Sequence, residues 1–325
     1  MDINEFPEIP DQIITAARNV ELVVFIGAGI SQCLGGPSWA EFAEKILNFL
    51  CDEGKISYKE KVFLGKDEKN IRRTLSICWR FLESQEDLKP DWDVIFPTKF
   101  DNNIYDDLLE FKSTFITTNY DKNIDYAAIR RHYPELISHI KTKTPDSPIK
   151  MKYDFDEAYA RGLFYYEAQE MTHYEPQPSK IFHLHGSTID FKSMVVTTQQ
   201  YLNAYSYSGT QKSPHRELLE RIFTEKTLLF VGTSMSEYEI LEYLNFTRDR
   251  RHFMLYPIFN ENIDLLEHYS AYFNMFGINL IPYNTSQKGP ELITEIIKSW
   301  KGIIGSNAGE LATPKGLEKL DRVSF

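Results

Sequence analysis

The sequence predicts an α/β fold: a Rossmann-like, doubly wound and mostly parallel sheet, with helical insertions that form a smaller module. Short apolar runs typical of strands buried on both faces, such as Leu22–Ile26 and Thr227–Gly232, alternate with longer patterns typical of amphipathic helices. Polar clusters follow four of the predicted strands. In sheets of this class, ligands bind outside the carboxyl ends of the strands, so those clusters also predict where a site lies.

The first part of the chain supplies two of the predicted strands. A helix over 11–19 leads into a strand over 22–26, which ends in a glycine turn. A second helix begins near Pro37, where Ser38 and Glu41 have the spacing of a capping box. Residues 55–110 are predicted to be a mostly helical insertion, followed by a strand over 111–118 and a helix over about 121–132.

Residues 133–180 interrupt this alternation. Five prolines and a tyrosine-rich segment predict an inserted, partly helical module or lid, because so many aromatic side chains need burial. Strands are predicted over 181–186, 227–232, 252–259 and 278–283, with helices between them. The last helix starts at 289–291 and ends at about Lys301, so residues 1–301 are expected to form one domain and residues 302–325 a tail or linker.

The composition limits the class of protein. A chain of 325 residues is long enough for one large α/β domain, and its net charge of −11 argues against a general nucleic-acid-binding surface. No apolar run is long enough to span a membrane, and the acidic N-terminus lacks the pattern of a signal peptide. Cys33, Cys51 and Cys78 include no Cys-x-x-Cys pair, so we expect no cysteine zinc site and a cytoplasmic location.

Four polar clusters are predicted to meet at one edge of the sheet: residues 27–31, 117–121, 185–187 and 232–234. Gly27 and Gly29 let the backbone approach a ligand closely, and the turn is expected to offer N–H groups to a phosphate. Alone, the turn also fits a tight strand-to-helix connection that binds nothing. The third glycine of the dehydrogenase fingerprint and the lysine of a P-loop are both missing.

The polar residues of these clusters allow more than one role. Asn119 and Asp121 either cap the next helix or present an amide and a carboxylate to a pocket. His183 and His185 alternate along a strand and should share a face, but no third ligand accompanies them for a metal. We expect His183 in the core and His185 at the cleft, where it could act as a general base. Neither serine at the strand ends has the nucleophile elbow of a serine hydrolase.

The four clusters occur in the order seen in sirtuins, and the chain resembles that family over about residues 15–300. The motifs are Gly27-Ala-Gly-Ile-Ser31, Thr117-Thr-Asn-Tyr-Asp121, His183-Leu-His-Gly-Ser187 and Gly232-Thr-Ser234. Thr118 departs from the family's glutamine, Pro37-Ser-Trp-Ala replaces its Pro-Asp-Phe-Arg, and the four zinc cysteines are missing. The pattern is therefore most similar to bacterial defence-associated sirtuin-like domains, which resemble NAD hydrolases that deplete NAD upon phage infection.

The resemblance implies an NAD-binding catalytic domain without zinc. It implies a glycohydrolase that cleaves NAD to nicotinamide and ADP-ribose in antiphage defence by abortive infection. By matching positions, Asn119 and His185 would be catalytic, with His185 as the base. The residues that would hold NAD are Gly27, Ala28, Gly29, Ser31, Asp121, Gly232, Thr233, Ser234 and Asn284.

Two other functions remain open at this stage. One is an NAD-dependent protein deacylase or ADP-ribosyltransferase; the other is a non-catalytic sensor of NAD or ADP-ribose. The presence of both Asn119 and His185 favours catalysis, because a sensor needs no base. An unregulated NAD hydrolase would kill its host, so we expect control by a homo-oligomer, a lid, a partner protein or a further domain. No membrane partner is expected.

Overall fold

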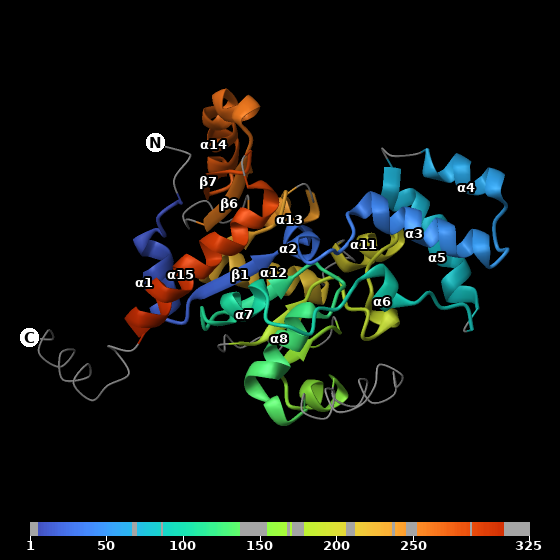
Figure 1. Ribbon diagram of the computed structural model, residues 1–325, viewed down its shortest axis with the longest axis horizontal. Coiled ribbons are helices and arrows are strands. Elements are labelled where there is room, and N and C mark those ends of the chain that lie inside the picture. Colours follow the sequence, from blue (N-terminus) through green and yellow to red (C-terminus); the bar gives the residue numbers. More distant parts are fainter. Residues whose placement is uncertain are drawn as a thin grey trace, which may run out of the picture.

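Figure 1 shows the computed structural model of the chain, which describes residues 6–66, 70–85, 87–136, 155–167, 170, 179–205, 212–235, 238–244, 252–286 and 288–308. Within these residues, seven strands form one sheet in the order β3-β4-β2-β1-β5-β6-β7. The strands are β1 (Leu22–Ile26), β2 (Thr114–Thr117), β3 (Phe164–Tyr165), β4 (Ile181–His183), β5 (Thr227–Val231), β6 (His252–Ile258) and β7 (Ile278–Asn284). All of the pairings are parallel, which confirms the predicted doubly wound α/β fold.

The central strand β1 sets the position of the site. Its five residues are all buried, as expected for an apolar strand with helices on both faces. Ile26 lies in register with Thr117 of β2 and with Val231 of β5, and Thr117 with His183 of β4. The chain passes to β2 on one side of β1 and later returns to β5 on the other. The carboxyl end of β1 is therefore the switch point at which such sheets bind ligands.

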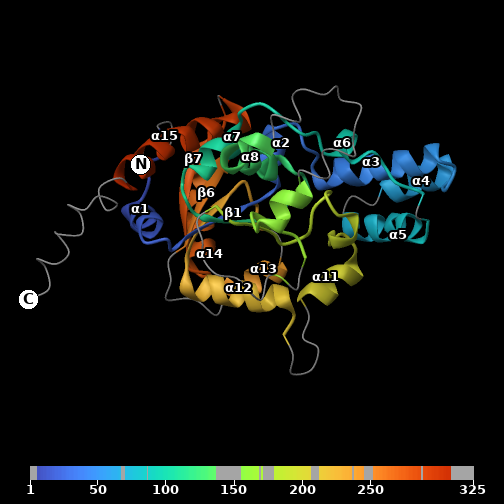
Figure 2. The same cartoon turned by 90° about the horizontal axis from the view of Figure 1, so that it is seen from below.

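Helices cover the two faces of the sheet, as Figure 2 shows. One face carries α1 (Asp11–Arg18), α7 (Ile104–Leu109), α8 (Asn123–His132) and α15 (Leu292–Ala308), whose apolar side chains pack with Val24 and Ile26. The opposite face carries α11 (Thr198–Tyr205), α12 (Pro214–Glu225), α13 (Tyr238–Leu244) and α14 (Leu266–Asn274), which pack with Val23 and Phe25. The alternation of side chains along β1 thus divides the core into two layers.

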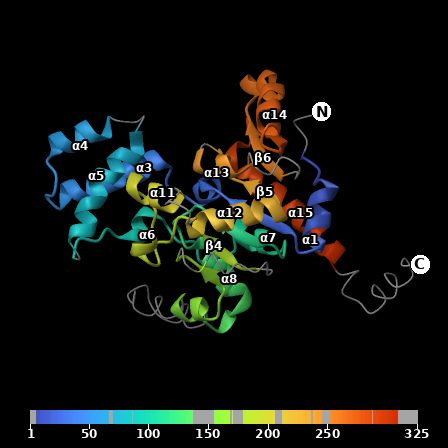
Figure 3. The same ribbon diagram turned by 180° about the vertical axis from the view of Figure 1, so that it is seen from behind.

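A smaller helical module projects from one side of the molecule, away from α1, as Figures 1 and 3 show. It consists of α3 (Trp39–Asp52), α4 (Tyr58–Gly65), α5 (Ile71–Ser84) and α6 (Trp92–Ile95), with its own core around Phe42 and Trp79. The capping box that starts α3 is confirmed, with Ser38 and Glu41 each accepting the other's backbone N–H. The expected insertion over 55–110 differs in one respect, because α7 packs on the sheet beside α8 and α15.

The described part of residues 133–180 extends the main domain. Phe164 pairs with Ile181 in the edge strand β3, which the sequence did not predict. Phe155, Phe164 and Tyr166 lie in the core layer beneath α8. The main domain therefore buries these aromatic side chains, and among the described residues no separate lid covers them. The rest of the predicted module, residues 137–154, 168–169 and 171–178, lies outside the described residues.

The prediction that the last helix ends at about Lys301 is wrong. After the short helix η5 (Gly289–Glu291), α15 continues to Ala308, with Ile304 buried in the main core. A glycine inside a helix costs only about 1 kcal/mol, so burial of Ile304 outweighs the signal from Gly302. Further short helices include α2 (Ala28–Cys33), η3 (Phe191–Ser193) and η4 (Asn260–Leu265). Among the described residues, no helix combines the length and apolar character needed to cross a membrane.

Candidate functional site

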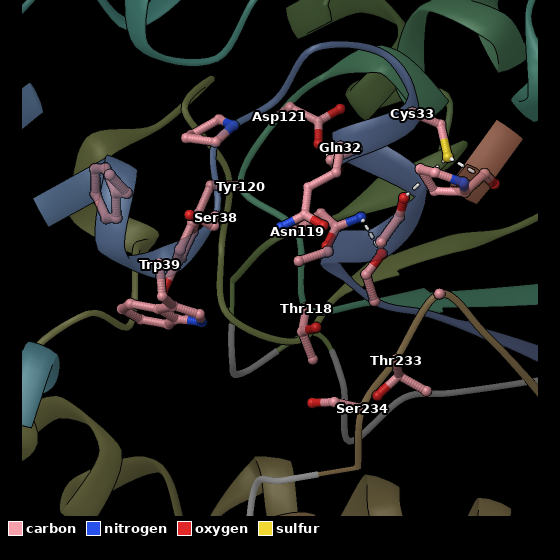
Figure 4. A pocket seen from close by; sticks show the side chains of 18 of the residues that line it. Gln32, Cys33, Ser38, Trp39, Thr118, Asn119, Tyr120, Asp121, Thr233 and Ser234 are labelled. Carbon is pink, nitrogen blue, oxygen red and sulfur yellow. Dashed lines mark hydrogen bonds between the residues drawn. The ribbon is translucent and has the colours of Figure 1, made fainter. Parts of the chain in front are cut away.

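A cavity of about 990 Å³ lies at the carboxyl end of the sheet, between the sheet and the helical module (Figure 4). This volume is at the upper end of the range of roughly 300–1,000 Å³ for small-molecule sites. Three of the four predicted polar clusters line it: the glycine turn, residues 118–121 and residues 232–234. The helical module supplies Trp39, Phe42, Phe96 and residues 70–73, and the ends of β6 and β7 supply Pro257, Phe259, Tyr283 and Thr285.

The glycine turn packs directly against the loop that follows β5. The amide of Gly27 donates to the carbonyl of Val231 (3.0 Å), and that of Gly29 to the carbonyl of Gly232 (2.7 Å). A Cβ atom on Gly27 would lie 2.7 Å from the Cα of Thr233, so a side chain there would push the two segments apart. The expectation that this turn offers free N–H groups is wrong for Gly27 and Gly29, because neighbouring carbonyls use both amides.

Asn119 links the end of β2 to the glycine turn. Its Nδ2 donates to the carbonyl of Gly27 (3.0 Å) and to the hydroxyl of Tyr105 (3.3 Å), and its backbone N–H to Oγ1 of Thr117 (3.0 Å). Only 7% of the residue is exposed, and it lies at the wall of the cavity. Its side-chain bonds run to the glycine turn and to α7, which favours the pocket role over capping of α8.

Asp121 joins α2 to the start of α8. It accepts hydrogen bonds from the hydroxyl of Ser31, from the backbone N–H of Asn123 (3.0 Å) and from Nδ2 of Asn123 (2.7 Å). Burial raises the pKa of this carboxyl, and the three hydrogen bonds offset only part of that effect. Asp121 therefore serves both of its possible roles, because it binds a first-turn amide of α8 and also lines the cavity.

His183 is buried against two hydrogen-bond acceptors. Its Nε2 lies 2.8 Å from Oδ1 of Asp125, and its Nδ1 lies 3.4 Å from the backbone carbonyl of Asn119. Burial by itself lowers the pKa of His183, but the Asp125 carboxylate and these hydrogen bonds together raise it above its usual value. An imidazolium donates from both nitrogens and so fits both acceptors. The Asp125–His183 pair thus supports the backbone at Asn119.

His185 lies behind the cavity wall. It is 1% exposed and is not among the described residues that line the cavity. Its Nε2 lies 2.7 Å from the hydroxyl of Tyr205 and its Nδ1 lies 3.2 Å from that of Tyr201. Burial, with smaller effects from His215 and Arg72, lowers the pKa of His185 well below its usual value, so the ring is neutral at pH 7.

The expectation that His183 and His185 share a strand face and that His185 borders the cleft is wrong for this structure. β4 ends at His183, and the chain turns at Gly186, which has a positive φ of 75°. Alternation along a strand therefore does not extend to His185. The two histidines meet different elements, since His183 contacts α8 and His185 contacts α11.

A protein-family profile described as the SIR2-like domain matches residues 113–276, which is half of the chain. The chain belongs to the SIR2-like domain family. The matched segment contains Asn119, Asp121 and His185, whereas the glycine turn lies before it. A comparison with curated proteins finds no match.

The structure brings most, but not all, of the remaining predicted residues to the cavity. Ala28, Ser31, Gly232, Thr233 and Ser234 all line the cavity. Asn284 does not, although its neighbours Tyr283 and Thr285 do. The Nδ2 of Asn284 donates to Asn260 (2.6 Å), and its Oδ1 accepts the backbone N–H of Ser286 (2.9 Å). This arrangement stabilises the loop after β7.

Several residues of the site were not predicted from the sequence, because no motif marks them. These residues are on helices, and their partners lie 14 to 58 residues away in the chain, beyond the reach of a local pattern; they are Tyr105, Asp125, Tyr201 and Tyr205. The arginines Arg72 and Arg73 are the only cations among the described residues that line the cavity. They occupy the first turn of α5, where positive charge opposes the helix dipole, and this conflict was a usable sign of function.

Within the described residues, no group of three or more histidine, cysteine, aspartate or glutamate side chains is arranged to hold a metal ion.

The buried His215 predicts acid sensitivity. Burial lowers its pKa to about 4, while the unfolded chain takes up the proton near pH 6.5. The free energy of unfolding should therefore fall as the pH drops below about 6.5. The protonation of His215 should account for a loss on the order of 3 kcal/mol by pH 4. We expect His215→Gln, which can still donate to the carbonyl of Leu184, to flatten this decline in urea unfolding at pH 7.5, 6 and 4.5. Parallel pH curves for the variant and the wild type would contradict the prediction.

Proposed function

We propose that this protein is an NAD glycohydrolase, which cleaves the bond between nicotinamide and ribose to release nicotinamide and ADP-ribose. One observation carries the proposal: Asn119, Asp121 and Ser31 meet at the wall of a large cavity at the switch point of a SIR2-like sheet. Ser31 and Asp121 are 90 residues apart in the sequence and are joined by a hydrogen bond.

The lining of the cavity suits a dinucleotide. The glycine turn and the loop after β5 leave backbone and small side chains at the surface, where a pyrophosphate and its riboses can approach closely. We assign this contact to Ala28, Gly29 and residues 232–234, and the nicotinamide amide to Asp121. Arg72 and Arg73 supply positive charge to the anionic ligand in a protein of net charge −11.

The reaction needs few groups from the protein. Nicotinamide leaves as a neutral molecule with the electrons of the glycosidic bond, and the ribose becomes oxocarbenium-like. A water molecule held by Asn119 then attacks, and its proton passes to His185. General-base help contributes about 10²–10⁴ in rate. Orientation within a cavity that limits water contributes much of the rest.

One observation favours a second candidate, a sensor that binds NAD or ADP-ribose without turnover. His185 is hydrogen-bonded to two tyrosines and does not line the cavity. This arrangement is expected in a site that is resting or non-catalytic. We also propose, from the resemblance to defence-associated domains, that NAD hydrolysis depletes NAD during phage infection and is controlled by oligomerisation or a partner protein.

The test measures nicotinamide and ADP-ribose released by the purified protein from NAD alone and from NAD with an acyl-lysine peptide. Each mixture is repeated with the product of any neighbouring gene, and NAD binding is measured by calorimetry. ADP-ribose without peptide supports the proposal, whereas peptide-dependent turnover points to a deacylase. Tight binding without turnover in every mixture points to the sensor.

A further inference from the structure

The side chain of Asn119 presents its oxygen, not its nitrogen, to the cavity. Its Nδ2 donates to the carbonyl of Gly27 (3.0 Å) and to the hydroxyl of Tyr105 (3.3 Å), so both of its N–H bonds are in use. No described residue hydrogen-bonds to Oδ1 of Asn119, yet this oxygen is not among the fully buried polar atoms that lack a partner. Because Asn119 lines the cavity, Oδ1 is the polar atom of its side chain that a ligand can reach.

Two neighbours hold the amide of Asn119 in this orientation. The carbonyl of Gly27 can only accept, so a rotated amide would set Oδ1 against it with no proton between the two oxygens. The other neighbour, Tyr105 on α7, is fully buried and does not line the cavity. Its hydroxyl therefore acts on the site only through the side chains that it touches.

The hydroxyl of Tyr105 is an acceptor for Asn119 because its own proton is used elsewhere. Its second hydrogen-bonding neighbour is the side chain of Ser31, whose proton is donated to Asp121. Ser31 thus offers Tyr105 only lone pairs, and Tyr105 donates to it. Burial and the charge of Asp121 raise the pKa of Tyr105 well above its usual value, so the hydroxyl keeps this proton.

The orientation of the amide decides how Asn119 can hold a water molecule. An acceptor binds water through one of its hydrogens, which leaves the lone pairs of the water oxygen free to attack. A donor would bind the water through a lone pair and so compete with the attack. The oxygen of Asn119 is therefore the end of the amide that suits a nucleophilic water.

We propose that Tyr105 is a positioning residue, which keeps Oδ1 of Asn119 toward the cavity as the acceptor for the attacking water. The proposal rests on NAD hydrolysis as the reaction. The water oxygen bonds to C1′ of the ribose, and nicotinamide leaves with the electron pair of the glycosidic bond. The proton that the water loses passes to the general base, proposed above as His185, while Tyr105 keeps its own proton throughout.

The first test is Tyr105→Phe, which keeps the ring in the core and removes only the hydroxyl. One N–H of Asn119 then lacks its acceptor, and the amide can rotate. We expect kcat for NAD cleavage to fall about 10–10²-fold while the dissociation constant for NAD, measured by calorimetry, changes less than about threefold. Wild-type kcat in this variant would overturn the proposal.

Asn103→Ala is the matched control, because it weakens the same helix without removing the hydroxyl. Asn103 caps α7 by accepting the backbone N–H of Tyr105 (3.0 Å), and it does not line the cavity. This variant should have a lower melting temperature than the wild type but keep kcat within about threefold. An equal loss of kcat in the two variants would mean that the position of α7 matters and not the hydroxyl of Tyr105.

A second measurement does not depend on turnover. The two Nδ2 protons of Asn119, assigned in the NMR spectrum with Asn119→Ala, should exchange slowly with solvent in the wild type and in Asn103→Ala. In Tyr105→Phe they should exchange at least about tenfold faster. Fast exchange in the wild type would overturn the proposed orientation. If the wild type cleaves no NAD in any mixture, the proposed reaction fails, and this measurement still decides whether Tyr105 holds the amide.

Discussion

Asn119→Ala should lower kcat for NAD cleavage by at least about 10²-fold, because the amide that would hold the attacking water and the ribose is removed. The variant also loses the bonds from Nδ2 to Gly27 and Tyr105, which costs about 1–3 kcal/mol of stability. The variant should therefore still fold, with a lower melting temperature than the wild type. Product release from NAD, measured by chromatography beside thermal unfolding, tests both statements.

The control for this variant is Asn203→Ala, since Asn203 is exposed on α11 and, among the described residues, its side chain bonds to Gln199 one turn away. It should keep full activity. His185→Ala should reproduce the loss seen with Asn119→Ala. Normal turnover by either folded variant would remove the mechanistic assignment of that residue, whatever the fate of the proposed overall reaction.

Asp125→Ala should destabilise the protein by about 3–5 kcal/mol, because it leaves His183 buried without its carboxylate partner. The loss should exceed the usual effect of a single substitution. Since His183 also contacts the carbonyl of Asn119, the variant should lose NAD-cleaving activity at temperatures where it is still folded. Urea unfolding and turnover at the same temperature measure the two effects separately.

Asp107→Ala is the matched control. Asp107 pairs with Lys301 at the partly exposed junction of α7 and α15, where an ion pair contributes about 0–1 kcal/mol. Equal destabilisation by the two substitutions would show that burial of the Asp125–His183 pair has no special energetic consequence.

Much of the fold followed from local pattern. Three features are each specified by a few neighbouring residues, and the structure has all three: the apolar run of β1, the glycine turn and the capping box before α3. Errors arose where a local signal competed with packing. Gly302 suggested an end to α15, but Ile304 finds a place in the core, and the aromatic residues near β3 are buried by the sheet.

From the sequence, the site could be predicted only as a group of polar residues at the ends of strands. The register of β1 with β2 and β5 brings residues 27–31, 118–121 and 232–234 together, as expected for a parallel sheet. The partners of these residues could not be predicted, because they come from helices that contact the strand ends only in the folded chain. Tyr105 beside Asn119 and Tyr201 beside His185 are of this kind.

The sequence by itself determined that this protein has a parallel α/β sheet with glycine turns and polar side chains at one edge. It does so because apolar periodicity and the need for glycine are properties of neighbouring residues. Only the tertiary structure decided that the amides of Gly27 and Gly29 donate to the end of β5 and to the loop after it. It also decided that His183 is paired with Asp125, whereas His185 is buried against Tyr205. Those outcomes depend on which distant groups share a buried space, where each donor and acceptor must find a partner.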